Sequence, residues 1–169
     1  MRAGPVVTER LRLEPLSVDH AAAMVEVLAD PSLYEFTGGS PPGLAELTER
    51  YARQAVGHSP SGDQWWLNWV VTLDGAPVGY VQATVGTDVG VLGDEAEIAW
   101  VLDPRHQGRG LATEAAAAVV DRLAAEGVDR LVAHIHPDHL ASARVAERLG
   151  LAPTDAVEDG EVRWVRTLG

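Results

Sequence analysis

Alternating and periodic apolar positions divide the first third of the chain into one predicted strand and two predicted helices. Residues 7–15 alternate apolar and polar side chains and end at a proline, which is typical of a half-buried strand. Ser17 precedes a segment over 18–29 whose apolar residues recur at helical spacing, so we expect Ser17 to cap a helix there. A loop rich in Gly, Ser and Pro at 37–43 leads into a second predicted helix near 44–56.

The remaining pattern predicts a sheet with mostly antiparallel neighbours. The pairs Asp74-Gly75 and Asp159-Gly160 stand between β-prone runs, which indicates two hairpins. Predicted strands cover 64–73, 77–85, 94–102, 130–136, 151–157 and 161–167, and predicted helices cover 111–126 and the segment from the N-cap Asp138 to Leu149. Only one strand-helix-strand unit is clear. We therefore expect an α/β (α+β) fold over 1–169 as a single domain, with a mixed sheet of six to seven strands and about four helices.

Charge and composition narrow the classes of partner. The 169 residues carry 13 basic and 25 acidic side chains, and this formal net charge of -12 argues against a nucleic acid or an anionic membrane as partner. The chain has no cysteine, which excludes catalysis by a cysteine nucleophile. No apolar run is long enough to span a bilayer and no signal peptide is evident, so we expect a cytoplasmic protein.

A glycine-bearing loop between a strand and a helix carries the strongest chemical signal. Gly108 and Gly110 let the backbone approach a ligand, and the helix that follows offers unpaired N–H groups and a positive dipole end. This combination is suited to a phosphate or pyrophosphate, to which Thr113 can add a hydroxyl. Neither common nucleotide motif fits, because a dinucleotide fingerprint needs a third glycine at position 113 and a P-loop needs a lysine, which the chain lacks.

The hexapeptide Gln107-Gly108-Arg109-Gly110-Leu111-Ala112 resembles the Gln/Arg-x-x-Gly-x-Gly/Ala signature of the GNAT superfamily of N-acetyltransferases. Its flanks, and further stretches at 8–13, 69–81 and 142–151, are similar to the RimJ/RimL-like branch, which acetylates protein N-termini and related amines. The resemblance spans nearly the whole chain. It implies acetyl-CoA as co-substrate, an amine as acceptor and no metal. Whether the chain forms a homodimer stays open.

The resemblance also implies where acetyl-CoA binds. In that family two central strands splay apart, the pantetheine arm lies in the gap, and successive backbone amides hold the pyrophosphate. The implied contact residues are Trp100, Val101, Leu102, Gln107, Gly108, Arg109, Gly110, Leu111, Ala112, Thr113, His139 and Ser142. A backbone N–H near Val101 would polarise the thioester carbonyl, an effect worth about 3 kcal/mol per donor elsewhere.

Direct attack by the bound amine then needs a base and a weak acid. Glu97, on the strand beside the splay, is the candidate base, acting through water, and Asp94 and Glu95 are rivals. Many members of the family use a tyrosine on the last helix as the acid, but the matching position here is Ala146. Ser142 is the candidate replacement, with a helix-start residue bonding its own backbone as the alternative.

Histidines mark the second departure from the family pattern. His139 stands where the family usually has an asparagine that bonds the pantetheine, and an imidazole also donates one hydrogen bond. His134 and His136 lie nearby, so a metal site has to be weighed, but spacing fixes no third ligand and we expect none.

Three other functions remain open on the sequence. The first is an acetyltransferase of a small-molecule amine, such as an antibiotic or an amino-acid derivative, for which the loop at 37–43 and the tryptophans at 65, 66 and 69 would decide. The second is a non-catalytic acyl-CoA-binding sensor, motivated by Ala146 and His139. The third is a mixed α/β domain without a coenzyme A site.

Overall fold

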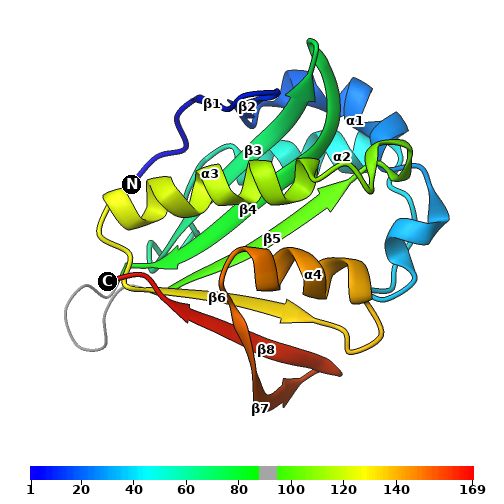
Figure 1. Ribbon diagram of the computed structural model, residues 1–169. Helices are drawn as coiled ribbons and strands as arrows, with labels where there is room; N and C mark the ends of the chain where they lie inside the picture. Colours follow the sequence, from blue (N-terminus) through cyan, green and yellow to red (C-terminus); the bar gives the residue numbers. More distant parts are fainter. Residues whose placement is uncertain (88–94) are drawn as a thin grey trace.

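The computed structural model describes residues 1–87 and 95–169, which form one eight-stranded sheet with four α-helices (Figure 1). The strands, in spatial order, are β1 (Val6–Val7), β2 (Leu11–Pro15), β3 (Gln64–Leu73), β4 (Ala76–Gly86), β5 (Glu95–Leu102), β6 (Arg130–Ile135), β8 (Glu161–Thr167) and β7 (Ala152–Glu158). Neighbours are antiparallel except β5 and β6, which are parallel. The mixed, mostly antiparallel sheet is therefore confirmed, with one strand more than the sequence predicts.

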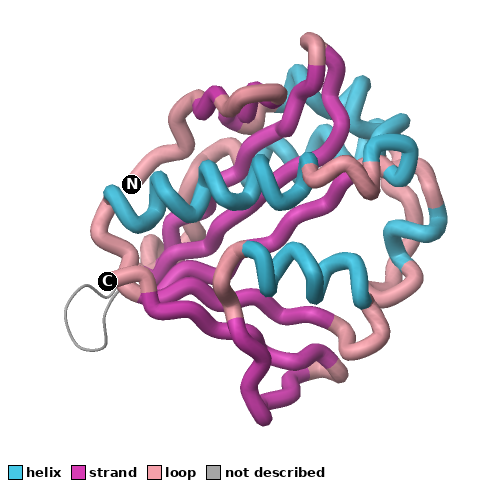
Figure 2. Tube along the Cα trace, in the orientation of Figure 1, coloured by secondary structure: helices cyan, strands magenta, loops and turns pink. Residues whose placement is uncertain are grey.

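The helices lie on both faces of the sheet (Figure 2). They are α1 (Ala21–Val27), α2 (Leu44–Gln54), α3 (Leu111–Ala125) and α4 (Leu140–Arg148). The larger buried cluster includes Ile98 and Leu131 and packs against α3 and α4, and we call this side of the sheet the α3 face. A smaller cluster with Val70 packs against α1 and α2 on the opposite side, the α1 face. None of the described helices is long and apolar enough to cross a membrane.

The predicted strand over 7–15 is wrong as a single element. The chain reverses between the two short strands, so that β1 pairs with β2 and Val7 lies opposite Arg12. Thr8 closes this turn, because its N–H donates to the carbonyl oxygen of Leu11 at 2.9 Å. The Thr8 hydroxyl lies 2.7 Å from Glu114 Oε1, and this contact with α3 holds the turn from outside. A partner so distant in sequence leaves no trace in local periodicity, which explains the wrong prediction.

The ends of two helices also differ from the prediction. The segment predicted over 18–29 starts as a 3-10 turn at Val18–His20, and α1 covers only Ala21–Val27. Ser17 is the N-cap of this 3-10 turn, and its N–H donates to His20 Nδ1 at 3.0 Å, whereas the N-cap of α1 is His20. Asp138 as an N-cap is wrong by one residue, because α4 begins after His139. The Asp138 N–H donates instead to the ring of His136 at 3.1 Å, which delays the helix.

The parallel strands β5 and β6 separate partway along their length. They pair only from Glu95 opposite Arg130 to Glu97 opposite Val132. Beyond this point β5 pairs with β4, and β6 pairs with β8, in the part of the chain that the structure describes. The predicted splay is thus present. Gly79 of β4 lies opposite the end of β5, where a Cβ would clash with the Val101 carbonyl oxygen, so glycine allows this close approach.

Candidate active site

The glycine loop before α3 presents free backbone N–H groups to open space. Gly108 and Gly110 have φ values of 77° and 76°, in the left-handed region that favours glycine, and Gly110 is the N-cap of α3. A Cβ on Gly108 would meet no atom within 4 Å. The first helical bond runs from Glu114 N–H to the Gly110 carbonyl at 3.0 Å, so the N–H groups of residues 111–113 start the helix without a helical acceptor. This is the arrangement that binds an anion.

Thr113 adds an independent sign of a ligand at this loop. Its Oγ1 atom is buried and has no hydrogen-bond partner among the described residues. Buried hydroxyls in native proteins are nearly always hydrogen-bonded, so an unpartnered one beside free N–H groups indicates a missing acceptor. A pyrophosphate, which is rich in acceptor oxygens, fits the chemistry of this donor set.

Arg10 and Glu114 brace the loop from the side of β2. The Glu114 carboxylate accepts from the Arg10 N–H at 2.9 Å and from the Arg10 guanidinium at 2.7 Å. Arg10 Nη1 donates to the Arg109 carbonyl at 3.0 Å. Burial raises the pKa of Glu114, but the hydrogen bonds from Thr8 and Arg10 outweigh it, and the pKa lies below its ordinary value. The loop is therefore held by an ion pair that ties it to the N-terminal strands.

Two further contacts fix the loop to the end of β5. Gln107 Nε2 donates to the Leu102 carbonyl at 2.9 Å, which links the signature to the last residue of the strand. Asp103 is buried and accepts from the Arg105 guanidinium at 2.6 Å, and these hydrogen bonds hold the pKa of Asp103 below its usual value. Arg105 is thus engaged by Asp103.

Glu97 lies where β5 and β6 part. It is the last residue of β5 paired with β6, and its side chain is 56% exposed. Glu97 Oε1 lies 3.1 Å from His134 Nδ1. The rival carboxylate of Glu95 is taken by two arginines, at 2.8 Å from Arg163 and 3.6 Å from Arg130. The other rival, Asp94, lies outside the described residues.

Ser142 and His139 lie together at the start of α4. Ser142 Oγ is 3.4 Å from His139 Nε2, a contact with another side chain at the start of the same helix. The Phe36 ring stacks on His139 at 4.7 Å between centroids, and burial lowers the pKa of His139. Ala146, at the position that matches the family's tyrosine, is fully buried in the core cluster.

The structure separates the three histidines that the sequence groups. His134 contacts Glu97, whereas His136 and His139 both lie against Phe36, with ring centroids 5.2 Å and 4.7 Å away. Phe36 comes from the segment between α1 and α2, so this aromatic stack joins the start of α4 to that segment. The sequence does not predict that Phe36 is a site residue, although it is the only phenylalanine in the chain.

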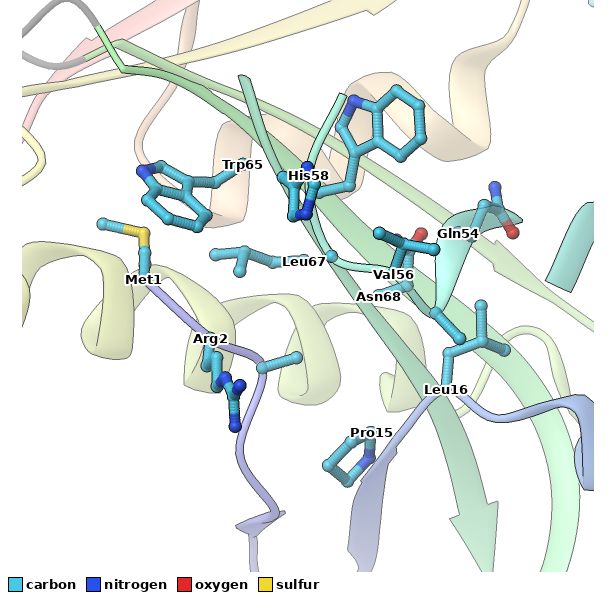
Figure 3. A pocket seen from close by; sticks show the side chains of 14 residues that line it. Met1, Arg2, Pro15, Leu16, Gln54, Val56, His58, Trp65, Leu67 and Asn68 are labelled. Atoms are coloured by element: carbon cyan, nitrogen blue, oxygen red, sulfur yellow. The ribbon is translucent and has the colours of Figure 1, made fainter. Parts of the chain in front are cut away.

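The tryptophans lie near a pocket at the other end of β3. Trp65 and Trp66 belong to the lining of a pocket of about 450 Å³ beside the N-terminal residues and the end of α2 (Figure 3). Trp69 is fully buried and donates from Nε1 to the Gly4 carbonyl at 2.8 Å. The glycine loop adjoins the opposite end of the sheet, because Leu102 lies opposite Gly79 near the β3–β4 turn. The pocket is therefore separate from the loop.

Comparison with known proteins places the chain in a family. Residues 10–152 match the Acetyltransferase (GNAT) domain family, which covers most of the chain. A sequence search of curated proteins gives no match.

Solved structures share the fold over nearly their whole length. RimL, a ribosomal L7/L12 alpha-N-protein acetyltransferase in complex with coenzyme A, has a TM-score of 0.81 at 18% identity, over 97% of this chain and 98% of that one. A GNAT-family acetyltransferase from Bacillus anthracis gives 0.76 at 18% identity, over 98% and 99%. The aminoglycoside acetyltransferase AAC(6')-Ib with coenzyme A gives 0.75 at 23%, over 93% and 94%. Because the family match covers the signature loop, the splay and the helices around them, the chain belongs to the GNAT acetyltransferase family and is an N-acetyltransferase.

Proposed function

We propose that this N-acetyltransferase acetylates the α-amine of a protein or peptide N-terminus, with acetyl-CoA as the donor. The observation that carries the proposal is the place of Glu97, an exposed carboxylate at the point where β5 and β6 part. When bound, acetyl-CoA supplies the acetyl group as an activated thioester.

The donor side would be held by backbone more than by side chains. The N–H groups that start α3, with Thr113 Oγ1, fit the pyrophosphate. The backbone of Trp100 to Leu102 faces the splay without a partner strand on that side and would bind the pantetheine arm. A backbone N–H near Val101, on the side of β5 that faces the splay, would polarise the thioester carbonyl, and Ser142 would protonate the leaving sulfur. His139, beside Ser142, would contact the arm.

The acceptor would approach from the α1 face, because α3 and α4 cover the other face. Strand register places Trp66, Thr84 and Glu97 in one row across β3, β4 and β5. Side chains alternate between faces along a strand, so these three share the face of Val70, which is the α1 face. All three are at least partly exposed. They form an open floor that ends at the candidate base.

The length of this floor favours a peptide over a small amine. Neighbouring strands lie about 4.8 Å apart, so Trp66 is roughly 10 Å from Glu97 across β4. An extended peptide advances about 3.3 Å per residue, so its third residue would reach Trp66 when its α-amine is at Glu97. A compact amine at Glu97 would leave Trp66 unused. RimL, the protein N-terminal acetyltransferase in the comparison, shares the fold and supports this choice of acceptor.

The test is an acceptor screen with acetyl-CoA, read by mass spectrometry, over N-terminal peptides and over small amines including aminoglycosides. We expect acetylation of the peptide α-amine. Glu97→Gln should lower kcat by about 10²- to 10⁴-fold, the usual contribution of a general base, while leaving the Kd for acetyl-CoA unchanged. Glu95→Gln is the matched control, because that carboxylate is already bound to arginines. Turnover of small amines alone, or binding of acetyl-CoA with no transfer, would contradict the proposal.

A further inference from the structure

His134 lies between two carboxylates on the α1 face. Its Nδ1 is 3.1 Å from Glu97 Oε1, and its Nε2 is 3.7 Å from Glu158 Oε2, at the end of β7. The His134 side chain is only 17% exposed, whereas Glu97 and Glu158 are 56% and 75% exposed. Nε2 is buried and has no hydrogen-bond partner in the described part of the chain. An imidazole is therefore fixed beside the candidate base, with one nitrogen committed and the other free.

The contact between Glu97 and His134 crosses the splay just after the backbone pairing ends. Glu97 pairs with Val132, and His134 is two residues further along β6, on the same face. The cross-strand neighbour of His134 on β8 is Arg163, whose guanidinium donates to Glu95 at 2.8 Å. Arg163 is therefore occupied by Glu95. Among the described residues, it is the His134 side chain that hydrogen-bonds Glu97.

We infer that His134 is a positioning residue for Glu97, and that Glu158 sets the response of this pair to pH. The inference rests on the proposed role of Glu97 as the base. An ionised carboxylate only accepts hydrogen bonds, so a neutral His134 donates Nδ1–H to Glu97 Oε1. This bond fixes one oxygen of an otherwise exposed side chain and leaves Oε2 to take the proton of the acceptor amine. Held in one rotamer, the carboxylate loses no conformational entropy when the acceptor arrives.

Protonation of His134 changes the pair in two ways. The imidazolium gains an Nε2–H that faces the Glu158 carboxylate, and it puts a positive charge beside Glu97. A neighbouring cation weakens a carboxylate as a base, so the active state needs Glu97 ionised and His134 neutral together. Among the residues that the structure describes, the charged groups that face this ring are Glu97 from β5, Glu158 from β7 and Arg163 from β8. Protonation of either member therefore removes the active state, and protonation of the second member steepens the loss of activity at lower pH.

The kinetic test compares His134→Asn with His134→Leu. Asparagine places an amide donor near the position of Nδ1, whereas leucine removes the donor and keeps bulk. We expect His134→Leu to lower kcat about tenfold or more, a part of the contribution of a general base, with the Kd for acetyl-CoA unchanged. His134→Asn should restore most of this loss. On a plot of log kcat/KM against pH, the acid limb should be one proton less steep in His134→Asn than in the wild type.

A second measurement needs no acceptor. The NMR titration of the His134 ring should shift in Glu97→Gln and in Glu158→Gln, but not in Glu161→Gln, a control on the same hairpin that has no ion pair with His134. If the wild type acetylates no amine, the proposed function fails, and this titration still decides whether Glu97 and Glu158 are coupled to His134. A titration that is the same in Glu97→Gln as in the wild type would overturn the inference. Equal kcat and equal acid limbs in the wild type and His134→Leu would overturn it as well.

Discussion

Gly79→Ala should damage the site from a distance, because Gly79 allows β4 to approach the end of β5. An added Cβ would clash with the Val101 carbonyl oxygen and lie 3.0 Å from Leu102 Cα, and both are backbone atoms that cannot rotate away. Overpacking of this kind costs about 1–3 kcal/mol. For a chain of this size that corresponds to a fall in Tm of roughly 3–10 °C. Relief of the clash moves the end of β5, whose backbone would polarise the thioester, and a shift of about 1 Å at such a group costs up to about 10²-fold in rate.

The matched control is Gly86→Ala on the same strand. A Cβ there meets no atom within 4 Å, so this variant should keep or slightly raise the stability of the wild type. Thermal unfolding of both variants gives the stability difference. Calorimetric titration with acetyl-CoA shows whether the end of β5 still binds the coenzyme. Gly79→Ala should bind acetyl-CoA more weakly and Gly86→Ala should bind it as the wild type does. Equal stability and equal binding in the two variants would refute the account of the β4–β5 contact.

Three further changes test the surroundings of the site. Glu114→Gln should lower the free energy of unfolding by about 1–3 kcal/mol above about pH 5, where the carboxylate holds its charged hydrogen bonds. The pKa of Glu114 is lowered, so this difference in the free energy of unfolding should shrink as the pH falls below the ordinary pKa of 4.5 and through the lowered pKa. Urea unfolding at several pH values measures the difference, and a difference that does not change with pH would count against the ion pair. Ala146→Tyr should destabilise the fold by about 1–3 kcal/mol in the same assay, since that position is fully buried, and unchanged stability would show room for the family's tyrosine. Phe36→Ala should raise the pKa of His139 toward its ordinary value by exposing the ring, as an NMR titration would show, and an unchanged pKa would mean that Phe36 does not bury it.

Local sequence signals predict the elements and the glycine loop well. Strand periodicity, turn pairs and the glycines at 108 and 110 all act over a few residues, and the structure places the loop and the splay where the sequence predicts them. Prediction fails where a residue distant in the sequence determines the local structure. The strand over 7–15 reverses because Thr8 and Arg10 bond Glu114, and the periodicity of the segment carries no sign of that bond.

The chemistry of the site is less predictable for the same reason. Sequence spacing offers Asp94 and Glu95 as rivals to Glu97 for the base, and only the register of the sheet shows that Arg163 and Arg130 occupy Glu95. The partners of the histidines are likewise set by which strands and loops meet, so spacing alone groups residues that the fold separates. A residue type in a motif predicts a role, but its neighbours in space decide whether the side chain is free to perform it.

The central claim is that the glycine loop binds acetyl-CoA, and calorimetric titration of Gly108→Ala against Gly62→Ala tests it most directly. The two glycines have φ values of 77° and 76°, and a Cβ on either meets no atom within 4 Å, so the substitutions carry the same backbone strain. Only Gly108 belongs to the loop. We expect the wild type and Gly62→Ala to bind acetyl-CoA with the same Kd, and Gly108→Ala to bind it about tenfold more weakly or worse, a loss of about 1.4 kcal/mol. No binding by the folded wild type, or equal binding by the two variants, would contradict the account.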